Sequence, residues 1–463
     1  MFPRLRLARS LLHASGFMVV SIDDHEVANL RSACDEVFGP ENFIANVVWE
    51  KKYTRANDAK FFSDNHDHLL VYAKDHSQAK LGRVERGEEQ LSAYGNPDGH
   101  PKGEWKATPL HARSGSNNSA YTFQNGVTWE PPPGTYRRFS DETMSDMETG
   151  NEIWFGSDGH HVPSRKSFLS EMEGGMVPVT LWEHQFAGHN HEANSELKDI
   201  GMTATFTSPK PTRLIRRLLE LCTAGSHGEV VMDFFAGSGT TGHAVFAHNA
   251  ANVRSGLKCI LVQLPEVLLA ANPVQQASAT FCDGLGKPRT IAELTKERLR
   301  RAGAKIRKEN PLFKGDTGFR VFKLDSSSIR AWDPNRDKLK EALHEHSEHL
   351  LPGRTEQDVL FELLLKLGLD LTVPIVSRAI AGKIVHSIGA GALMVSLADG
   401  LSRDSIEDFA QGILTWRREI APPVSTNFVF KDSGFVDDVA KLNLVETLKQ
   451  GLASEQISGI RSV

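Results

Sequence analysis

The sequence predicts an α/β protein built on a mostly parallel sheet, with a loop-rich insertion and a smaller C-terminal α/β domain. Three observations support this prediction. Apolar, strand-like runs alternate with helix-like segments over residues 1–75 and again over 201–310, which is the pattern of βαβ units. Between these two sections the periodicity is lost. The length of 463 residues exceeds one ordinary domain and indicates two or three.

The first section is predicted from alternating helix and strand patterns. Arginines and leucines near the start end in a glycine before a short apolar run, which favours a helix followed by a strand over a targeting peptide. We expect helices at about 3–13 and 24–37 and strands at Phe17–Ile22, 44–49 and 68–73. No stretch reaches the roughly 18–20 apolar residues of a membrane span. We therefore expect a soluble, cytoplasmic protein without a membrane partner.

Three further sections follow. Residues 76–200 are rich in Gly, Pro, Asn, Ser and aromatics, and we expect no regular structure in the stretch Trp129–Pro133 before Gly134, because proline lacks a donor. In residues 201–332 helix-like and strand-like segments alternate again, with a helix after Pro211, strands at Val230–Phe234 and Cys259–Leu264, and a basic helix at about 290–308. Glu293 and Glu297 interleave the cations of that helix, which favours a structural amphipathic role. Residues 333–463 are predicted as the smaller domain, with a helix near 358–367 and strands near 384–388 and 392–397.

The composition excludes several classes of site. The formal net charge is −5, so any nucleic-acid binding must come from local basic clusters. The four cysteines form no C-x-x-C pair, which argues against a zinc ribbon and a disulfide framework. Histidines cluster, for example at His66/His68 and His189/His191, but none has the H-E-x-x-H spacing of one helical face. We therefore expect no metal site.

The clearest chemical signal is a glycine turn at residues 233–241. The strand Val230–Phe234 runs into Gly237 and Gly239, and Thr240 or Thr241 starts a helix. Such glycines let the backbone approach a ligand where α/β sheets bind ligands. The spacing is neither G-x-G-x-x-G nor the phosphate-binding G-K-S/T loop. A turn without a phosphate cradle favours a nucleoside with little phosphate, such as S-adenosylmethionine.

Two carboxylates accompany this turn. Asp233 stands at the end of one strand, where it could accept hydrogen bonds from a ligand amino group. Glu266 is expected to close the next strand, where a ribose-binding acid belongs in a nucleotide-binding βαβ unit. Each could be an ordinary strand-end acid. The pair, together with the glycine turn, indicates a nucleoside site.

The motif Asp-Phe-Phe-Ala-Gly-Ser-Gly-Thr-Thr, preceded by Ser208-Pro209-Lys210-Pro211, resembles motifs I and X of beta-class DNA amino-methyltransferases. More narrowly, the chain is similar to Mod subunits of type III restriction–modification systems. The ordered matches include residues 21–26, 65–68, 151–156, 260–266, 319–325 and 368–374.

This resemblance implies a permuted, Rossmann-like, S-adenosylmethionine-dependent methyltransferase that acts on N6 of adenine in duplex DNA. The target base would be flipped out of the stack. The catalytic part would come first (1–75), then target recognition (76–200), the cofactor part (201–332) and an assembly domain (333–463). It also implies a Mod homodimer and a Res helicase–nuclease partner. The implied cofactor contacts are Asp233, Phe235, Gly237, Gly239, Glu266 and Lys210; a solvated helix-start lysine is the alternative for Lys210.

The sequence departs from the family at the catalytic motif, because no Asp-Pro-Pro-Tyr or close variant occurs. We therefore assign no catalytic residue. Met1–Leu5 resembles the helix that follows the catalytic loop, so we expect the loop and its strand to lie upstream, next to the Phe17–Ile22 strand. The alternative is a catalytically inactive recognition or assembly subunit that binds DNA and S-adenosylmethionine.

The candidate DNA-binding residues are basic and lie beside aromatic residues. Such side chains neutralise phosphates, and arginine can also bind guanine in a bidentate manner. Ordinary surface solvation is the alternative for each of them. The candidates are Lys51, Lys52 and Arg55 near Tyr53, and Arg137 and Arg138 after Tyr136.

Overall fold

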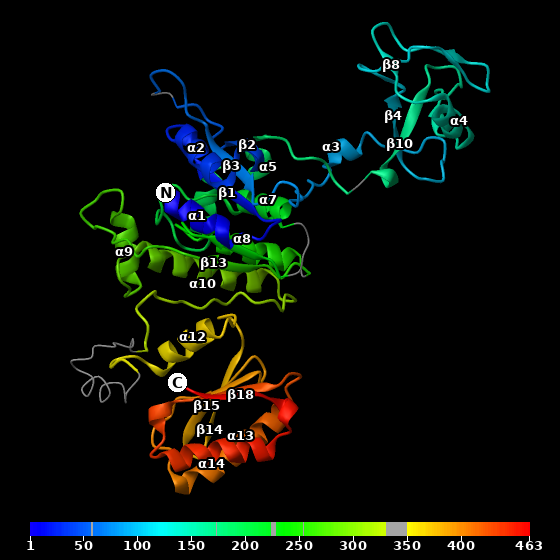
Figure 1. The fold of residues 1–463 in the computed structure, drawn as a ribbon. Helices are drawn as coiled ribbons and strands as arrows, with labels where there is room; N and C mark the ends of the chain where they lie inside the picture. The colour runs from blue at the N-terminus through cyan, green and yellow to red at the C-terminus, as the bar shows by residue number, and fades with distance from the viewer. Residues whose placement is uncertain (57–58, 173, 224–227, 253, 330–349) are drawn as a thin grey trace. The chain divides into compact units, whose positions relative to one another are not determined.

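The computed structural model describes residues 1–56, 59–172, 174–223, 228–252, 254–329 and 350–463. The chain forms two compact units, Met1–Gly318 and Phe319–Val463 (Figure 1). The domain boundary predicted between residues 332 and 333 falls outside the described residues. Within the described ranges, no helix is long and apolar enough to cross a membrane.

The N-terminal section forms a sheet in the order β1-β3-β2-β11. Its predicted helices and strands are confirmed, with ends shifted by a few residues. Side chains of β3 alternate between the faces, as a strand requires: Leu70 and Tyr72 join a core with the two helices, whereas Leu69 and Val71 join a core on the other face. The elements are α1 (Phe2–Leu11), β1 (Phe17–Ile22), α2 (Val27–Phe38), β2 (Phe43–Glu50), β3 (His66–Ala73) and β11 (Leu181–Trp182).

The expected mostly parallel pairing is wrong for this sheet. β1 and β2 both pair antiparallel with β3, which lies between them, and only β11 pairs parallel with β2. The helical crossover α2 makes β1 and β2 run in the same direction, as the βαβ pattern predicts. The chain then returns from β2 to β3 through a loop whose described residues form no helix, and such a loop joins antiparallel strands.

The middle section contains short strands and one well-packed helix in otherwise irregular chain. A three-stranded sheet has the order β4-β10-β9, and a separate small core includes Leu110, Phe123, Met144 and Ile153. These strands are too short to give a periodic signal in the sequence. The elements are α3 (Glu88–Leu91), β4 (Trp105–Pro109), β5 (His111–Ala112), β6 (Tyr121–Thr122), β7 (Thr128–Trp129), β8 (Tyr136–Arg137), α4 (Asp141–Thr149), β9 (Ile153–Trp154) and β10 (Ser164–Phe168).

The section that carries the glycine turn has a parallel pair, β12–β13, joined by α8. Helix α8 is buried over most of its length and contacts both α7 and α10. The helices α5, α6 and α9 were not predicted from the sequence. The elements are α5 (His184–Ala187), α6 (Asn190–Asp199), α7 (Thr212–Cys222), β12 (Val230–Asp233), α8 (Thr240–Ala251), β13 (Lys258–Leu261), α9 (Gln276–Gly284) and α10 (Ile291–Glu309).

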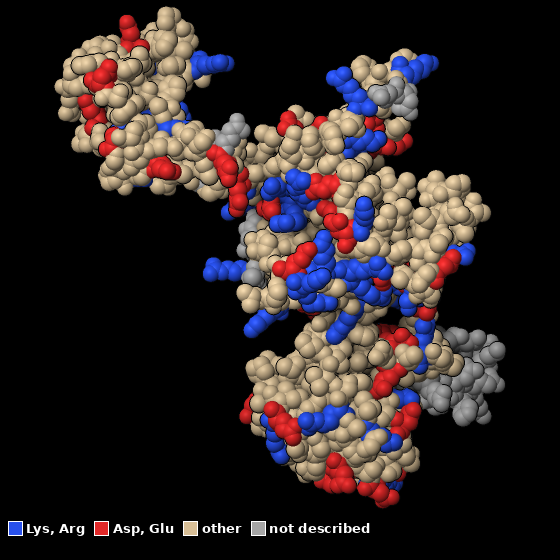
Figure 2. Space-filling model, turned by 180° about the vertical axis from the view of Figure 1, so that it is seen from behind, with Lys and Arg blue, Asp and Glu red and all other residues tan. Residues whose placement is uncertain are grey.

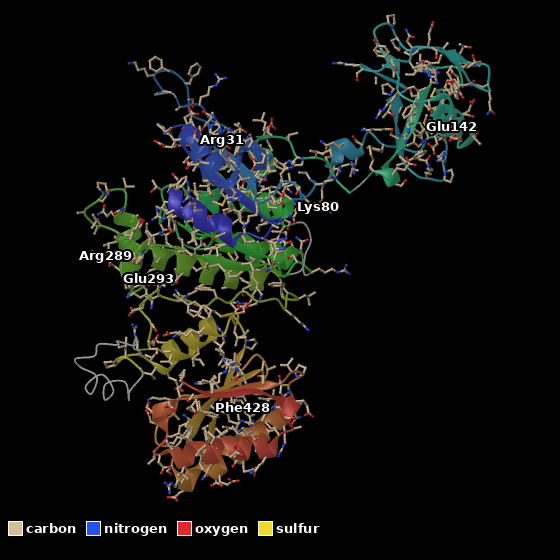
Figure 3. All side chains as sticks on the ribbon, viewed as in Figure 1. Arg31, Lys80, Glu142, Arg289, Glu293 and Phe428 are labelled. Carbon is tan, nitrogen blue, oxygen red and sulfur yellow. The ribbon has the colours of Figure 1, made fainter. Side chains whose placement is uncertain are left out.

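The C-terminal unit is a five-stranded sheet in the order β14-β15-β16-β17-β18. Two cores form, one with α13 and α14 and one with α12; Phe428 lies in the first of them and is fully buried (Figure 3). The predicted helix and two strands are confirmed as α12, β15 and β16, whereas the rest was not predicted. The elements are α12 (Glu356–Lys366), β14 (Ile375–Ile380), β15 (Lys383–Ile388), β16 (Leu393–Ser396), α13 (Arg403–Ile420), β17 (Thr426–Phe430), α14 (Asp438–Gly451) and β18 (Ile457–Ser462).

Candidate functional site

The glycine turn joins the end of β12 to the start of α8, as the sequence predicts. Gly237 has a φ of 48° and Gly239 a φ of 76°, in the left-handed region that favours glycine. The Gly239 N–H donates to the carbonyl of Ala236 over 2.7 Å. A Cβ on Gly239 would also lie 3.0 Å from Thr295. Both glycines are therefore required by the shape of the turn.

Asp233 holds this turn from its N-terminal side. One carboxylate oxygen accepts the Phe235 N–H over 3.0 Å, and the other accepts the Thr241 hydroxyl over 2.6 Å. An ionised carboxylate has about four acceptor sites. Asp233 can thus hold the turn and still accept a hydrogen bond from a ligand.

A buried arginine holds the turn from beneath. Arg298 of α10 is 0% exposed, and its Nη1 donates to both Ser238 Oγ and Thr240 Oγ1 over 2.8 Å. Burial lowers the pKa of Arg298 to about 10, against the opposing effect of Glu196. Helix α10 is otherwise the amphipathic helix that the sequence predicts, with Glu293–Lys296 and Glu297–Arg301 pairs along it. Arg298, in the middle of this helix, is however buried and supports the glycine turn.

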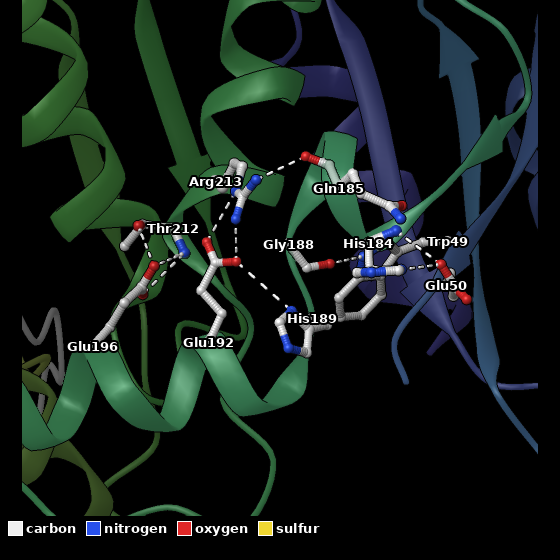
Figure 4. A network of polar contacts seen from close by, with 10 residues as sticks. All are labelled: Trp49, Glu50, His184, Gln185, Gly188, His189, Glu192, Glu196, Thr212 and Arg213. Carbon is white, nitrogen blue, oxygen red and sulfur yellow. Dashed lines mark hydrogen bonds and ion pairs between the residues drawn. The ribbon is translucent and has the colours of Figure 1, made fainter. Parts of the chain in front are cut away.

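A polar network extends this support to α6 and α7 (Figure 4). Glu196 lies 3.6 Å from Arg298 Nη2 and accepts the Thr212 hydroxyl over 2.6 Å and the Thr212 N–H over 3.1 Å. Burial raises the pKa of Glu196, although the Thr212 hydrogen bonds oppose this. On the same helix, Glu192 pairs with Arg213. These contacts fix the start of α7 next to the glycine turn.

The segment after β13 lies against the turn. The Gly237 N–H donates to Gln263 Oε1 over 2.7 Å, and the Ala236 N–H donates to the carbonyl of Val262. Glu266 is exposed and does not close the strand as expected, because β13 already ends at Leu261. Phe235 is 52% exposed, with Arg4 lying 5.7 Å from its ring centroid.

Lys210 contacts the turn through its backbone, since its carbonyl accepts the Thr240 hydroxyl over 3.1 Å. Its ammonium group donates instead to Asp67 over 2.5 Å and lies 4.7 Å from the Trp49 ring centroid. Lys51 donates to the other oxygen of Asp67 over 2.9 Å. Burial raises the pKa of Asp67, but the hydrogen bonds from Lys210 and Lys51 outweigh this and leave it lowered.

The structure divides the DNA-binding candidates into two groups. Lys52, Arg55 and Arg138 are exposed. The other two candidates are mostly buried and paired: Lys51 is 11% exposed and also pairs with Asp64, and the Arg137 side chain is 1% exposed and pairs with Asp141. On the face drawn in Figure 2, Lys and Arg side chains gather on the unit Met1–Gly318, with acidic side chains among them.

Several residues that build the site were missed from the sequence. The hydroxyl of Thr295 donates to the Gly237 carbonyl over 2.5 Å, across 58 positions of sequence. Arg298 contacts Ser238 across 60 positions. The sequence around these two residues does not indicate either contact. Gln263 is the one member with a local signal, since it is a polar residue within the apolar run 260–264.

Comparison with known proteins gives matches over most of the chain. The N6/N4 methyltransferase family model, described as DNA methylase, matches residues 1–252. The Mod subunit of the type III restriction–modification enzyme StyLTI of Salmonella typhimurium LT2 is 32% identical over an alignment of 343 positions, which covers 72% of this chain and 49% of that protein. The EcoP15I Mod subunit of Escherichia coli is 27% identical over an alignment of 488 positions, gaps included, which covers 97% of this chain and 70% of that protein.

A further relative is the EcoPI Mod subunit of Escherichia phage P1, 29% identical over 64% of this chain and 48% of that protein. The chain thus spans about half the length of two of these relatives. The solved structure of a Thermus thermophilus protein, assigned as a DNA modification methylase and complexed with S-adenosyl-L-methionine, aligns with a TM-score of 0.26 at 14% identity, over 67% of this chain and 77% of that one.

Proposed function

Because this chain belongs to the DNA methylase family, we propose that it is the modification subunit of a type III restriction–modification system. Its reaction would transfer a methyl group from S-adenosylmethionine to N6 of adenine in duplex DNA. The observation that carries the proposal is the glycine turn between β12 and α8, held by Asp233 and Arg298. The similarity to three Mod subunits supports the choice of substrate and system.

The proposed cofactor pocket consists of Asp233, Phe235, Gly237, Gly239 and Glu266. Asp233 keeps free acceptor sites for the amino group of the methionine part, and exposed Glu266 is available to a ribose hydroxyl. Apolar side chains suit the faces of an adenine ring, and Phe235, Val262 and Leu264 are 52%, 44% and 59% exposed. The residues present therefore fit S-adenosylmethionine, which would supply the activated methyl group. Lys210 is left out, because its ammonium group pairs with Asp67.

The proposed DNA contacts are the exposed Lys52, Arg55 and Arg138. The first two lie in the loop after β2, within the section 1–75 that we assign to catalysis, and Arg138 lies in the target-recognition section 76–200. Sections 201–332 and 333–463 would bind the cofactor and direct assembly. The proposed partners are duplex DNA, a second Mod subunit and a Res helicase–nuclease subunit, in the cytoplasm.

A second candidate function is a recognition or assembly subunit that binds S-adenosylmethionine and DNA without transferring the methyl group. One observation favours it: the 463 residues contain no Asp-Pro-Pro-Tyr. In the family that the chain resembles, the strand of this motif lies between the equivalents of β1 and β12, and both of these are edge strands of their sheets.

Two measurements on the full chain test these proposals. S-adenosylmethionine binding is measured by calorimetry, and Asp233→Ala is expected to abolish it; unchanged affinity would remove the turn from the pocket. Transfer of a tritiated methyl group is then measured on adenine-containing duplexes and on the same duplexes with N6-methyladenine. Transfer to the first alone supports the enzyme, whereas binding of both ligands without transfer supports the second candidate.

A further inference from the structure

A group of three potential metal ligands lies outside the glycine turn, where β1 ends and β3 begins. Asp24 follows β1 in the turn to α2, and His66 and His68 are the first and third residues of β3. One ligand atom from each residue lies within 4.8 Å of the others. We propose that these three side chains bind a divalent transition-metal ion of the Zn²⁺ class.

The strand geometry brings the two histidines together. Residues i and i+2 of a strand point to the same face, and the imidazole rings of His66 and His68 lie 5.1 Å apart. Asp67 between them points to the opposite face, where it pairs with Lys51 and Lys210. His68 pairs in register with Ile22 of β1, two residues before Asp24. The antiparallel β1–β3 pairing thus places Asp24, the third ligand, near the two histidines.

The His68 imidazole is arranged as metal-binding histidines are. The residue is 9% exposed, and its Nε2 has no hydrogen-bond partner among the described residues. Nε2 lies 3.5 Å from Asp24 Oδ1, while Nδ1 contacts Asn46 Oδ1 over 3.1 Å. An amide oxygen only accepts, so a hydrogen bond to it requires the proton on Nδ1, and in the neutral imidazole Nε2 then carries the lone pair that can bind a metal ion. A buried acceptor without a donor is costly, and a bound cation would satisfy it.

The donor set selects the class of metal. Two imidazoles and one carboxylate suit zinc and similar ions, whereas Mg²⁺ and Ca²⁺ prefer oxygen alone. In a tetrahedral zinc site, neighbouring ligand atoms lie about 3.3 Å apart. His68 and Asp24 already approach this separation, and Asp24, whose side chain is 78% exposed, is free to move. Three protein ligands leave the fourth position to water.

We expected no metal site because the sequence lacks the H-E-x-x-H spacing, which places two histidines on one face of a helix. His66 and His68 instead have the i, i+2 spacing of a strand, and Asp24 follows the end of another strand, so that motif does not detect them. A bound ion would link the β1–α2 turn to the start of β3. This linkage would fix one end of the loop that carries Lys52 and Arg55. The inference is independent of the proposed function.

The test uses the full chain, freed of metal with a chelator and dialysed against Zn²⁺ in buffer of defined free metal concentration. We expect one zinc per chain by mass spectrometry, and at least a tenfold loss of affinity in Asp24→Asn and in His66→Ala. Asp24 is mostly exposed, so its variant retains the fold, which circular dichroism checks. His25→Ala is the matched control, since His25 is exposed and adjacent but outside the group; it should bind zinc as the parent does.

Two further variants test the positioning role of Asn46. Asn46→Leu removes the acceptor for His68 Nδ1 and should weaken zinc binding ten- to a hundredfold, as loss of such an outer partner does. Asn46→Asp retains the acceptor and should restore binding. Absence of zinc from the parent chain, or equal zinc affinity in the parent and Asp24→Asn, would overturn the proposal. Binding of S-adenosylmethionine should be unchanged in all these variants.

Discussion

Arg298 Nη1 donates a hydrogen bond to Ser238 Oγ over 2.8 Å, from the middle of α10 to the glycine turn. The same nitrogen donates to Thr240, and Nη2 lies 3.6 Å from Glu196. A guanidinium that is 0% exposed bears a desolvation cost that only good partners offset. The shape of the ligand turn therefore depends on a residue 60 positions downstream.

Replacement of this arginine should destabilise the unit Met1–Gly318. Arg298→Met keeps much of the volume but leaves Glu196, which is 19% exposed, without its cation; breaking a fully buried pair costs about 3–5 kcal/mol, which sets the upper bound. Urea denaturation should show this loss, accompanied by weaker S-adenosylmethionine binding. Arg300→Met is the control, because Arg300 is 48% exposed on the same helix and should change stability by under about 0.5 kcal/mol. Equal effects of both variants would contradict the buried role.

The hydroxyl of Thr241 should matter for the cofactor through Asp233. Its 2.6 Å hydrogen bond is to a charged group, and such bonds contribute about 1.5–3 kcal/mol. Thr241→Val preserves the shape and removes the bond, so we expect the free energy of unfolding to fall by about 1.5–3 kcal/mol and the S-adenosylmethionine affinity to fall about tenfold. Thr241→Ser, which retains the hydroxyl, should restore the affinity. If the valine variant binds as tightly as the parent, Asp233 does not need this partner.

The sequence predicted features that depend on neighbouring residues, and it missed contacts between residues that lie far apart in the chain. The turn of Gly237 and Gly239 was predictable because its φ angles restrict the residue type. The strand Phe17–Ile22 was predicted to the residue because its apolar run is bounded clearly. The helix that carries Arg298 was predicted as a structural amphipathic helix, but nothing in the neighbours of Arg298 indicates that its side chain reaches Ser238. Lys51 was predicted as a DNA-binding candidate, and its pairing with Asp67 could not be predicted because that carboxylate belongs to the next strand.

Acid should destabilise the chain through His243 of α8. Burial lowers the pKa of His243 from 6.5 to about 3, with a smaller contribution from Arg298. The neutral form is thus favoured in the folded state, so its stabilising effect is complete above pH 6.5 and is lost as the pH falls from 6.5 to about 3. His243→Leu cannot be protonated and should lose less stability over this range.

The measurement is the free energy of unfolding at pH 7, 5 and 4, with the variant compared with the parent. His13→Leu is the control, because His13 is exposed in the segment after α1. A parent–variant difference that stays constant with pH would show that His243 does not set this dependence. A difference that grows toward low pH, and only for His243→Leu, would support it.

Lys210 should act on stability and not on the cofactor. Its ion pair with Asp67 connects the segment before α7 to β3. Lys210→Met should therefore lower the free energy of unfolding by about 1.5–3 kcal/mol, the value typical of a hydrogen bond to a charged group, while S-adenosylmethionine affinity is retained. In a double-mutant cycle with Asp67→Asn the two effects should be non-additive. A selective loss of cofactor affinity in Lys210→Met would return this lysine to the pocket.

The exposed cations should contribute to DNA binding in a salt-dependent way. Each phosphate contact that a protein makes releases counterions, so the loss of one contact reduces the slope of log affinity against log salt by about 0.9. Lys52→Ala, Arg55→Ala and Arg138→Ala should each show such a reduction in fluorescence anisotropy titrations with a duplex. Lys449→Ala is the control, since Lys449 lies on α14 of the C-terminal unit and is 56% exposed there.

Arg137 and Arg138 allow a direct comparison of a structural role with a phosphate contact, because they are adjacent and only Arg138 is exposed. Arg138→Ala should change the salt slope without changing stability, because its side chain is exposed. Arg137→Ala should lower stability, because it removes the partner of Asp141 and the contact with Ser119. If both variants change only stability, the segment after Tyr136 supports the fold of this section and makes no phosphate contact.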